Sequence, residues 1–88
     1  MSGSEAIVLH RRILVVRDDA TGIVVTHEKV DAEGGEAPIA FYERIGERKK
    51  ELEEEYPESV VAEYGASSLS AVLGSWPEDF RPKPTSAP

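Results

Sequence analysis

The two histidines, His10 and His27, are the side chains of this chain whose usual pKa lies closest to neutrality. Imidazole is a common metal ligand and acid–base group, so this pair is the first place to look for chemistry. Each histidine falls on one strand of a predicted hairpin. Pairing outward from the turn places His27 opposite Val15 or Leu14 and not opposite His10. No third ligand follows at a recognisable spacing, so we expect no metal site and no cofactor.

The serines and glycines do not form a catalytic motif. Residues 65–68 contain two serines but lack the Gly-x-Ser-x-Gly pattern of a nucleophile elbow. Gly34 and Gly35 are not followed by the Gly-Lys-Ser/Thr of a phosphate-binding loop. The chain has no cysteine, which excludes disulfides and thiolate metal sites. We therefore expect no catalytic residues and a role other than catalysis.

Charged side chains are the remaining candidates for a binding surface. The chain carries 17 acidic and 10 basic residues, a formal net charge of −7. An acidic cluster ends the predicted first helix, where carboxylates oppose the negative end of the helix dipole. This cluster is either a contact surface or a small loss of helix stability that the domain tolerates. The candidate interaction residues are Glu53, Glu54 and Glu55 in this cluster, and Arg11, Arg12 and Arg17 on the predicted hairpin.

Nucleic-acid binding through the basic hairpin is an alternative with two requirements. Three arginines and Lys29 would have to share one face of the sheet, and aromatic residues would have to lie between them to stack on bases. The predicted strands contain no aromatic residue before Phe41. No segment of the chain is basic overall, so we favour solvent-facing charges that protect a sheet edge.

A β-hairpin is the first element that must position these residues. Its strands are predicted over residues 6–16 and 23–30, and Gly22 can adopt a positive φ where the turn enters the second strand. The central runs, residues 13–16 and 23–25, are apolar throughout and do not alternate with polar residues. Both faces of the hairpin therefore need cover, because a solvated hairpin alternates.

A long helix follows the hairpin. Pro38 suits a first helical turn, and Pro57 disfavours helix in the residue before it, so we expect a helix from Pro38 to about Tyr56. Many of its residues are charged, as expected for a solvated helix face. Its apolar residues are expected to form one stripe. This stripe begins with Ile39, Tyr42 and Ile45 and is extended by Phe41, Ile45, Leu52 and Tyr56.

A third strand over residues 59–64 leads into a short second helix. Ser67 or Ser68 can cap this helix, because a serine oxygen accepts hydrogen bonds from the amides of the first turn. We expect Trp76 and Leu73 to anchor the helix on the sheet. The predicted buried face consists of Leu69, Val72, Leu73 and Trp76.

The order β-β-α-β-α predicts one small α+β domain over residues 6–77, with a three-stranded sheet and two helices. Residues 1–5 are expected to be a flexible lead and residues 78–88 a disordered, proline-rich tail. We expect removal of residues 82–88 to leave stability unchanged, whereas Phe80 can pack back beside Trp76.

The function expected from these features is a non-catalytic protein–protein interaction or regulatory module, and we expect a homodimer. The short second helix offers too little cover for a hairpin that is apolar on both faces. The alternatives are an acidic inhibitor that occupies a cationic site of a nucleic-acid enzyme, and a nucleic-acid binder. The start of the sequence lacks signal-peptide features and no apolar stretch approaches the ~20 residues of a membrane span, so we expect a cytoplasmic protein.

Overall fold

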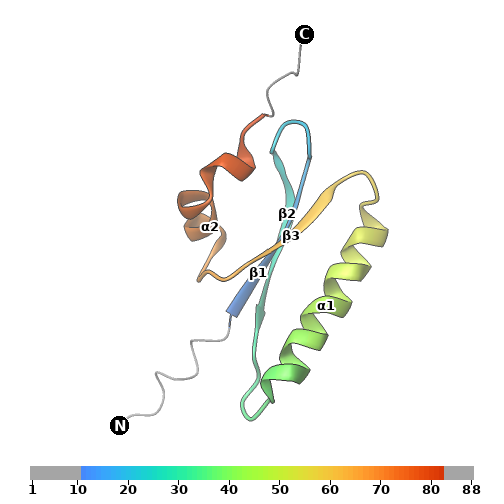
Figure 1. Cartoon of the computed structure of the whole chain (residues 1–88), viewed down its shortest axis with the longest axis vertical. Coiled ribbons are helices and arrows are strands. Elements are labelled where there is room, and N and C mark those ends of the chain that lie inside the picture. Colours follow the sequence, from blue (N-terminus) through green and yellow to red (C-terminus); the bar gives the residue numbers. More distant parts are fainter. Residues whose placement is uncertain (1–10, 83–88) are drawn as a thin grey trace.

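A three-stranded antiparallel sheet with a helix against each face forms the fold of the computed structural model, which describes residues 11–82 (Figure 1). The strand order is β2-β1-β3, so β1 is central and the other two strands are edges. This confirms the α+β class and the β-β-α-β-α order. The elements are β1 (Arg11–Arg17), β2 (Val24–Asp31), α1 (Pro38–Glu55), β3 (Val60–Tyr64), α2 (Leu69–Ser75) and the 3-10 helix η2 (Pro77–Phe80).

The strand register agrees with pairing outward from the turn. Val15 lies opposite His27 on β2, and Ile13 lies opposite Tyr64 on β3. A bulge interrupts the β1–β2 register at the turn end, where Arg17 pairs with Val24. The expected placement of His27 is therefore confirmed.

The hairpin turn is stabilised by Asp18. Its Oδ1 accepts hydrogen bonds from the backbone amides of Ala20 (2.9 Å) and Thr21 (2.8 Å). The turn therefore begins at Asp18. Gly22 has φ +77°, the left-handed conformation expected of it.

The core of the fold lies on both sides of β1. Residues 13–16 are at most 1% exposed, and alternate side chains enter two separate clusters. The first cluster lies under α1 and contains Leu14, Val16, Phe41, Ile45 and Leu52, among others. The second lies under α2 and contains Ile13, Val15, Tyr64 and Val72, with Trp76 and Phe80 packed against it. Burial of each large apolar side chain contributes about 1.5–3 kcal/mol.

The cover of β1 is therefore complete within one chain, and the reason given above for expecting a homodimer does not hold for this strand. The second helix is as short as expected, but η2 extends its cover over the sheet. The exposed apolar residues of the hairpin lie instead beside and within β2, where Ile23 is 65% and Val25 is 50% exposed.

Only part of the predicted apolar stripe on α1 is buried. Phe41, Ile45 and Leu52 face the sheet as expected, whereas Ile39 and Tyr42 are exposed. A helix advances by about 100° per residue, so Ile39 points about 160° away from Phe41. The buried stripe therefore follows Phe41, and the expectation for Ile39 and Tyr42 was wrong.

The C-terminal elements close the second face of the sheet. Ser68 caps α2, with its Oγ accepting from the amide of Ala71 at 3.2 Å. The Trp76 ring lies against that of Tyr64, with centroids 5.0 Å apart. Leu73 is exposed, and Val72 takes the buried position in the centre of α2.

The start of the predicted tail has a defined structure, because residues 78–80 belong to η2. The Phe80 ring packs 5.9 Å from the Tyr64 ring, and Tyr64 Oη donates a hydrogen bond to Asp79 at 2.8 Å. The rest of that tail beyond Pro82, the predicted lead and the first residues of the predicted first strand lie outside the described residues. No helix within residues 11–82 is long and apolar enough to cross a membrane.

Candidate functional site

The three candidate arginines are divided between the two faces of the sheet. Alternation along β1 places Arg11 and Arg17 on the α2 side and Arg12 on the α1 side. Arg11 forms two hydrogen bonds to the carboxylate of Asp31, at 2.5 and 3.0 Å. Arg12 donates to Tyr42 Oη at 2.8 Å and lies over that ring. Arg12 therefore does not share a face with Arg11 and Arg17, as the nucleic-acid alternative would require.

The acidic cluster Glu53, Glu54 and Glu55 lies at the exposed C-terminal end of α1. Within residues 11–82, these three side chains form no hydrogen bond or ion pair. No basic side chain lies in the last turn of the helix to compensate them. The structure thus keeps them available to solvent but adds nothing that points to a ligand.

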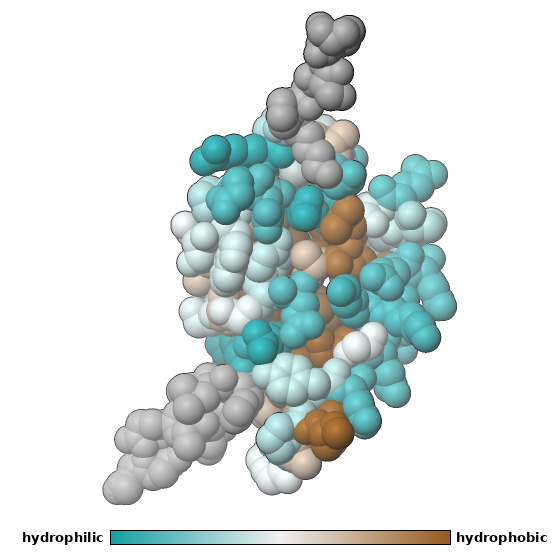
Figure 2. Space-filling model, viewed as in Figure 1, coloured by the Kyte–Doolittle hydropathy of each residue, from teal (hydrophilic) through white to brown (hydrophobic). Residues whose placement is uncertain are grey.

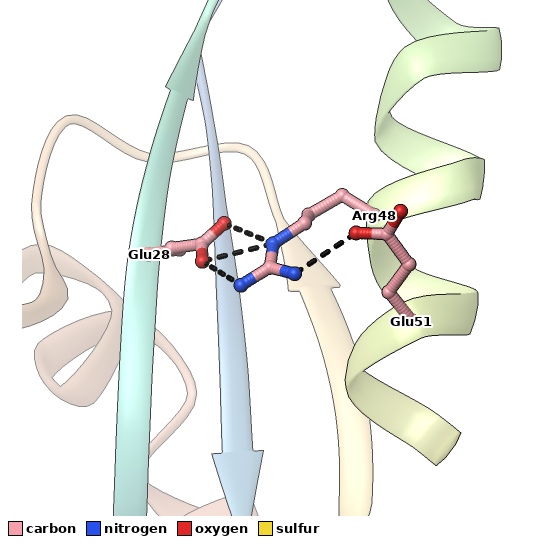
Figure 3. A network of polar contacts seen from close by, with 3 residues as sticks. All are labelled: Glu28, Arg48 and Glu51. Atoms are coloured by element: carbon pink, nitrogen blue, oxygen red, sulfur yellow. Dashed lines mark hydrogen bonds and ion pairs between the residues drawn. The ribbon is translucent and has the colours of Figure 1, made fainter. Parts of the chain in front are cut away.

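An ion-pair network connects β2 to α1 and was not predicted from the sequence (Figure 3). Arg48 Nε lies 2.9 Å from both carboxylate oxygens of Glu28, and Arg48 Nη1 donates to Glu51 at 2.9 Å. The hydrogen bonds from Arg48 lower the pKa of Glu28. A sequence signal did exist, because Arg48 falls within the stripe formed by Phe41, Ile45 and Leu52, where a charge requires a partner.

A shallow pocket of about 70 Å³ lies beside this network, between the second strand and the end of α1. Its volume is that of about two water molecules, far below the ~300–1,000 Å³ of typical ligand pockets. The guanidinium of Arg48 that lines it is already bound to two carboxylates. The lining residues are Thr26, His27, Glu28, Arg48, Leu52, Glu55 and Tyr56.

The histidines do not form a metal site in the described part of the chain. His27 is exposed on β2, opposite Val15, whereas His10 lies outside the described residues. Within residues 11–82, no group of three or more histidine, aspartate or glutamate side chains could hold a metal ion.

The outer side of β2 is the most unusual surface of the fold. We define the β2 edge as the strand Val24–Asp31 together with the preceding Ile23. In the sheet of the described residues, β2 has a neighbour on one side only, so one row of its amides and carbonyls faces outwards. Ile23 and Val25 are exposed beside this row. An open backbone edge and apolar side chains therefore occur together.

The opposite edge of the sheet is less accessible to a partner strand. β3 has five residues, whereas β2 has eight. Val61 of β3 is buried against α1, and Tyr64 is buried against α2. Short length and cover by neighbouring elements are common protections of an edge. The β2 edge is longer and is covered only in part, because Val30 is buried under α1 whereas Val25 is exposed.

The surface near the two helices has a different character. Figure 2 shows hydrophilic side chains over the outer side of α1, with hydrophobic side chains reaching the surface in the region between the two helices. Along β2, by contrast, apolar and charged residues are mixed: Val25, His27, Lys29 and Asp31 are all exposed. The β2 edge can therefore provide both apolar contact and charge-dependent selectivity.

Comparison with known proteins gives no match. No protein-family model matches the chain, and no curated protein and no solved structure shows significant similarity to it. The candidate site therefore rests on geometry, and the geometry favours the β2 edge.

Proposed function

We propose that this protein is a non-catalytic protein–protein interaction module that self-associates as a homodimer through the β2 edge. A single observation supports the proposal: within residues 11–82, the eight-residue strand β2 has no neighbouring strand on one side, and Ile23 and Val25 are exposed beside it. Such an edge is a ready template for pairing with another chain.

Pairing at this edge has a clear energetic benefit. It gives partners to the outward amides and carbonyls, which otherwise bond to water, and it removes Ile23 and Val25 from solvent. Complete burial of an exposed aliphatic side chain contributes about 1.5–3 kcal/mol, and a strand added at the edge buries Ile23 and Val25 only in part. The backbone hydrogen bonds and this partial burial together offset the cost of association.

The proposal is non-catalytic because the polar groups of the described residues act as structural links. Arg48 connects β2 to α1, and Arg11 connects the first strand to Asp31. Arg44 binds the carboxylate of Glu36, with distances of 2.8 and 3.0 Å. These contacts stabilise the domain. Arg48 is the only lysine or arginine among the residues that line the small pocket, and its guanidinium is already bound to Glu28.

The two alternative functions rest on charge alone. An acidic inhibitor would use Glu53, Glu54 and Glu55, and a nucleic-acid binder would use the arginines of β1. Glu55 lines the small pocket, and Arg11 and Arg12 are bound to Asp31 and Tyr42 of the same chain. Neither set lies beside an open backbone edge, so we favour the β2 edge.

A pair of matched variants tests the proposal. Val25→Lys places a charge on the β2 edge, whereas Ile39→Lys changes an even more exposed apolar residue on α1. Both sites are exposed, so both variants are expected to fold. Size-exclusion chromatography with light scattering at tens of micromolar should show a dimer for the unmodified chain and Ile39→Lys, and a monomer for Val25→Lys. A dimeric Val25→Lys variant would contradict the assignment of the edge.

A further inference from the structure

We infer that the apolar residues 7–9, which precede β1, dock on the exposed side chains of Ile39 and Tyr42 at the start of α1 in the same chain. Residues 7–9 lie outside the described residues, and the chain enters the described fold at Arg11, the first residue of β1. This docking goes beyond the proposed function and does not depend on self-association, because it involves neither β2 nor a second copy.

Ile39 and Tyr42 form a small exposed apolar surface, which we call the α1 patch. Ile39 is 71% exposed and Tyr42 is 43% exposed. The two residues are three positions apart in a helix, so their side chains are neighbours. Two side chains cannot supply the ~800 Å² that each partner buries in a specific interface between separate proteins. The α1 patch therefore suits a short segment that is already attached to the domain.

Arg12 connects the start of β1 to the α1 patch. Its Nη2 donates to Tyr42 Oη at 2.8 Å, and its guanidinium carbon lies 5.2 Å from the centre of the Tyr42 ring. β1 and α1 run in the same direction, and the first turn of α1 reaches beyond the start of β1 (Figure 1). A strand continued backwards from Arg11 therefore runs alongside the first turn of α1, where Ile39 lies.

The two flanks of α1 face different strands, and the α1 patch is on the flank nearer to the start of β1. Tyr42 faces Arg12 of β1. Arg44, by contrast, donates to the carbonyl of Asp31 on β2 at 2.8 Å. A helix advances by about 100° per residue, so Ile39 points about 60° from Tyr42 but about 140° from Arg44. Ile39 therefore lies on the flank of Tyr42, beside the point where the chain enters β1.

Val8 is the residue best placed to contact the α1 patch. It belongs to an apolar run, Ala-Ile-Val-Leu, over residues 6–9. Side chains alternate along a strand, so a continued β1 places Val8 on the same side as Arg12, which is the side of α1. The four residues from Val8 to Arg12 span about 13 Å when extended. This length carries Val8 past the start of β1 and along the first turn of α1.

The short connection to β1 makes a small contact sufficient. A tether of a few residues gives an effective concentration in the millimolar range. Contact of Val8 with Ile39 and Tyr42 is therefore populated within one chain. The same contact is too small to offset the cost of association between separate molecules. The occupant of the α1 patch is thus residues 7–9 of the same chain.

Disulfide formation tests the docking directly, because the chain contains no cysteine of its own. One full-length variant combines Val8→Cys with Ile39→Cys, and its matched control combines Val8→Cys with Ala40→Cys. Ala40 is exposed like Ile39 but points about 100° away from it, towards the other flank of α1. Under mild oxidation of dilute protein, we expect the first pair to form the intrachain disulfide at least ~10-fold faster than the control, because a disulfide requires close and aligned Cβ atoms.

Alkylation of a single cysteine gives a second readout that needs no disulfide geometry. The thiol of Val8→Cys is compared alone, with Ile39→Ser and with Ala40→Ser; both serine substitutions are neutral, so they add no charge near the thiol. We expect Ile39→Ser to raise the alkylation rate at least ~3-fold and Ala40→Ser to leave it unchanged, because a docked thiol is shielded from the reagent. Circular dichroism of each variant verifies that the domain is folded.

Three outcomes would overturn the docking. The first is an equal rate of disulfide formation in the two cysteine pairs, and the second is an equal alkylation rate in all three backgrounds. The third is an interchain disulfide as the main product of the first pair, which would assign the α1 patch to a second copy. The α1 patch is separate from the β2 edge, so Ile39→Lys remains a control for dimerisation whichever result is obtained.

Discussion

Replacement of Gly22 by alanine tests how the C-terminal segment is held against the hairpin. Gly22 has φ +77°, and a Cβ atom added to it would lie 2.5 Å from the carbonyl carbon of Phe80 and 2.7 Å from the backbone nitrogen of Arg81. Backbone atoms cannot rotate away as a flexible side chain can. The substitution must therefore displace either the turn or η2.

The expected loss of stability has two parts. The left-handed conformation costs an alanine roughly 1–2 kcal/mol. Displacement of η2 weakens the packing of Phe80 on Tyr64. Burial of a large apolar side chain contributes about 1.5–3 kcal/mol, so we assign about 2 kcal/mol to the loss of this packing. Together these parts give a loss of about 3–4 kcal/mol. At about 4–8 °C per kcal/mol for a domain of this size, the melting temperature should fall by at least about 12 °C.

Gly35→Ala is the matched control. Gly35 has φ +80°, but no atom lies within 4 Å of the position of its added Cβ. This variant therefore has the conformational cost of about 1–2 kcal/mol without the close approach. The difference between the two variants isolates the contact of the turn with η2.

Urea unfolding followed by circular dichroism measures both variants under the same conditions. We expect Gly22→Ala to lose about 2 kcal/mol more than Gly35→Ala. Equal losses in the two variants would mean that the backbone at Phe80 and Arg81 does not lie in close contact with Gly22, and would refute the reasoning.

Three further predictions concern the packing and the ion pairs. Trp76→Ala should lose about 2–4 kcal/mol in urea unfolding, whereas Leu73→Ala, at an exposed site in α2, should lose less than about 1 kcal/mol; similar losses would contradict this difference. The hydrogen bonds from Arg44 lower the pKa of Glu36 to about 2, below its unfolded value of 4.5. The stability that this pair contributes is therefore present above pH 4.5 and is lost as the pH falls towards 2, so Glu36→Gln should reduce stability at pH 7 but not at pH 2, as measured by urea unfolding. Arg48→Met should cost about 1 kcal/mol at pH 7, because its ion pairs are partly exposed; an unchanged unfolding midpoint would contradict their contribution.

The features that were predictable from the sequence depend on local rules. Pro38 and Pro57 set the bounds of α1, Ser68 caps the second helix, and Gly22 adopts the expected positive φ. The sequence left Val15 or Leu14 as the residue opposite His27, because two turn lengths were possible, and the structure has Val15 there.

The features that were missed depend on tertiary contacts. Strand order cannot be read from the hairpin itself, so the sequence did not show that β1 is central and that its apolar residues are covered by one chain. The pairing of Arg48 with Glu28 joins residues 20 positions apart in different elements. The packing of Phe80 was foreseen, but not the 3-10 helix that brings it there.

The candidate site changed for the same reason. The sequence directed attention to charged residues, and in the structure Arg11 and Arg12 bind neighbours on opposite faces of the sheet. The exposure of Ile23 and Val25 became apparent only once β2 was placed at an edge.

Sedimentation equilibrium of the unmodified full-length chain tests the central claim most directly. One chain has a mass of 9.6 kDa, so the homodimer has twice that mass. At tens of micromolar we predict a mass that approaches the dimer value and decreases on dilution towards that of one chain. A mass of 9.6 kDa at every concentration would contradict self-association through the β2 edge.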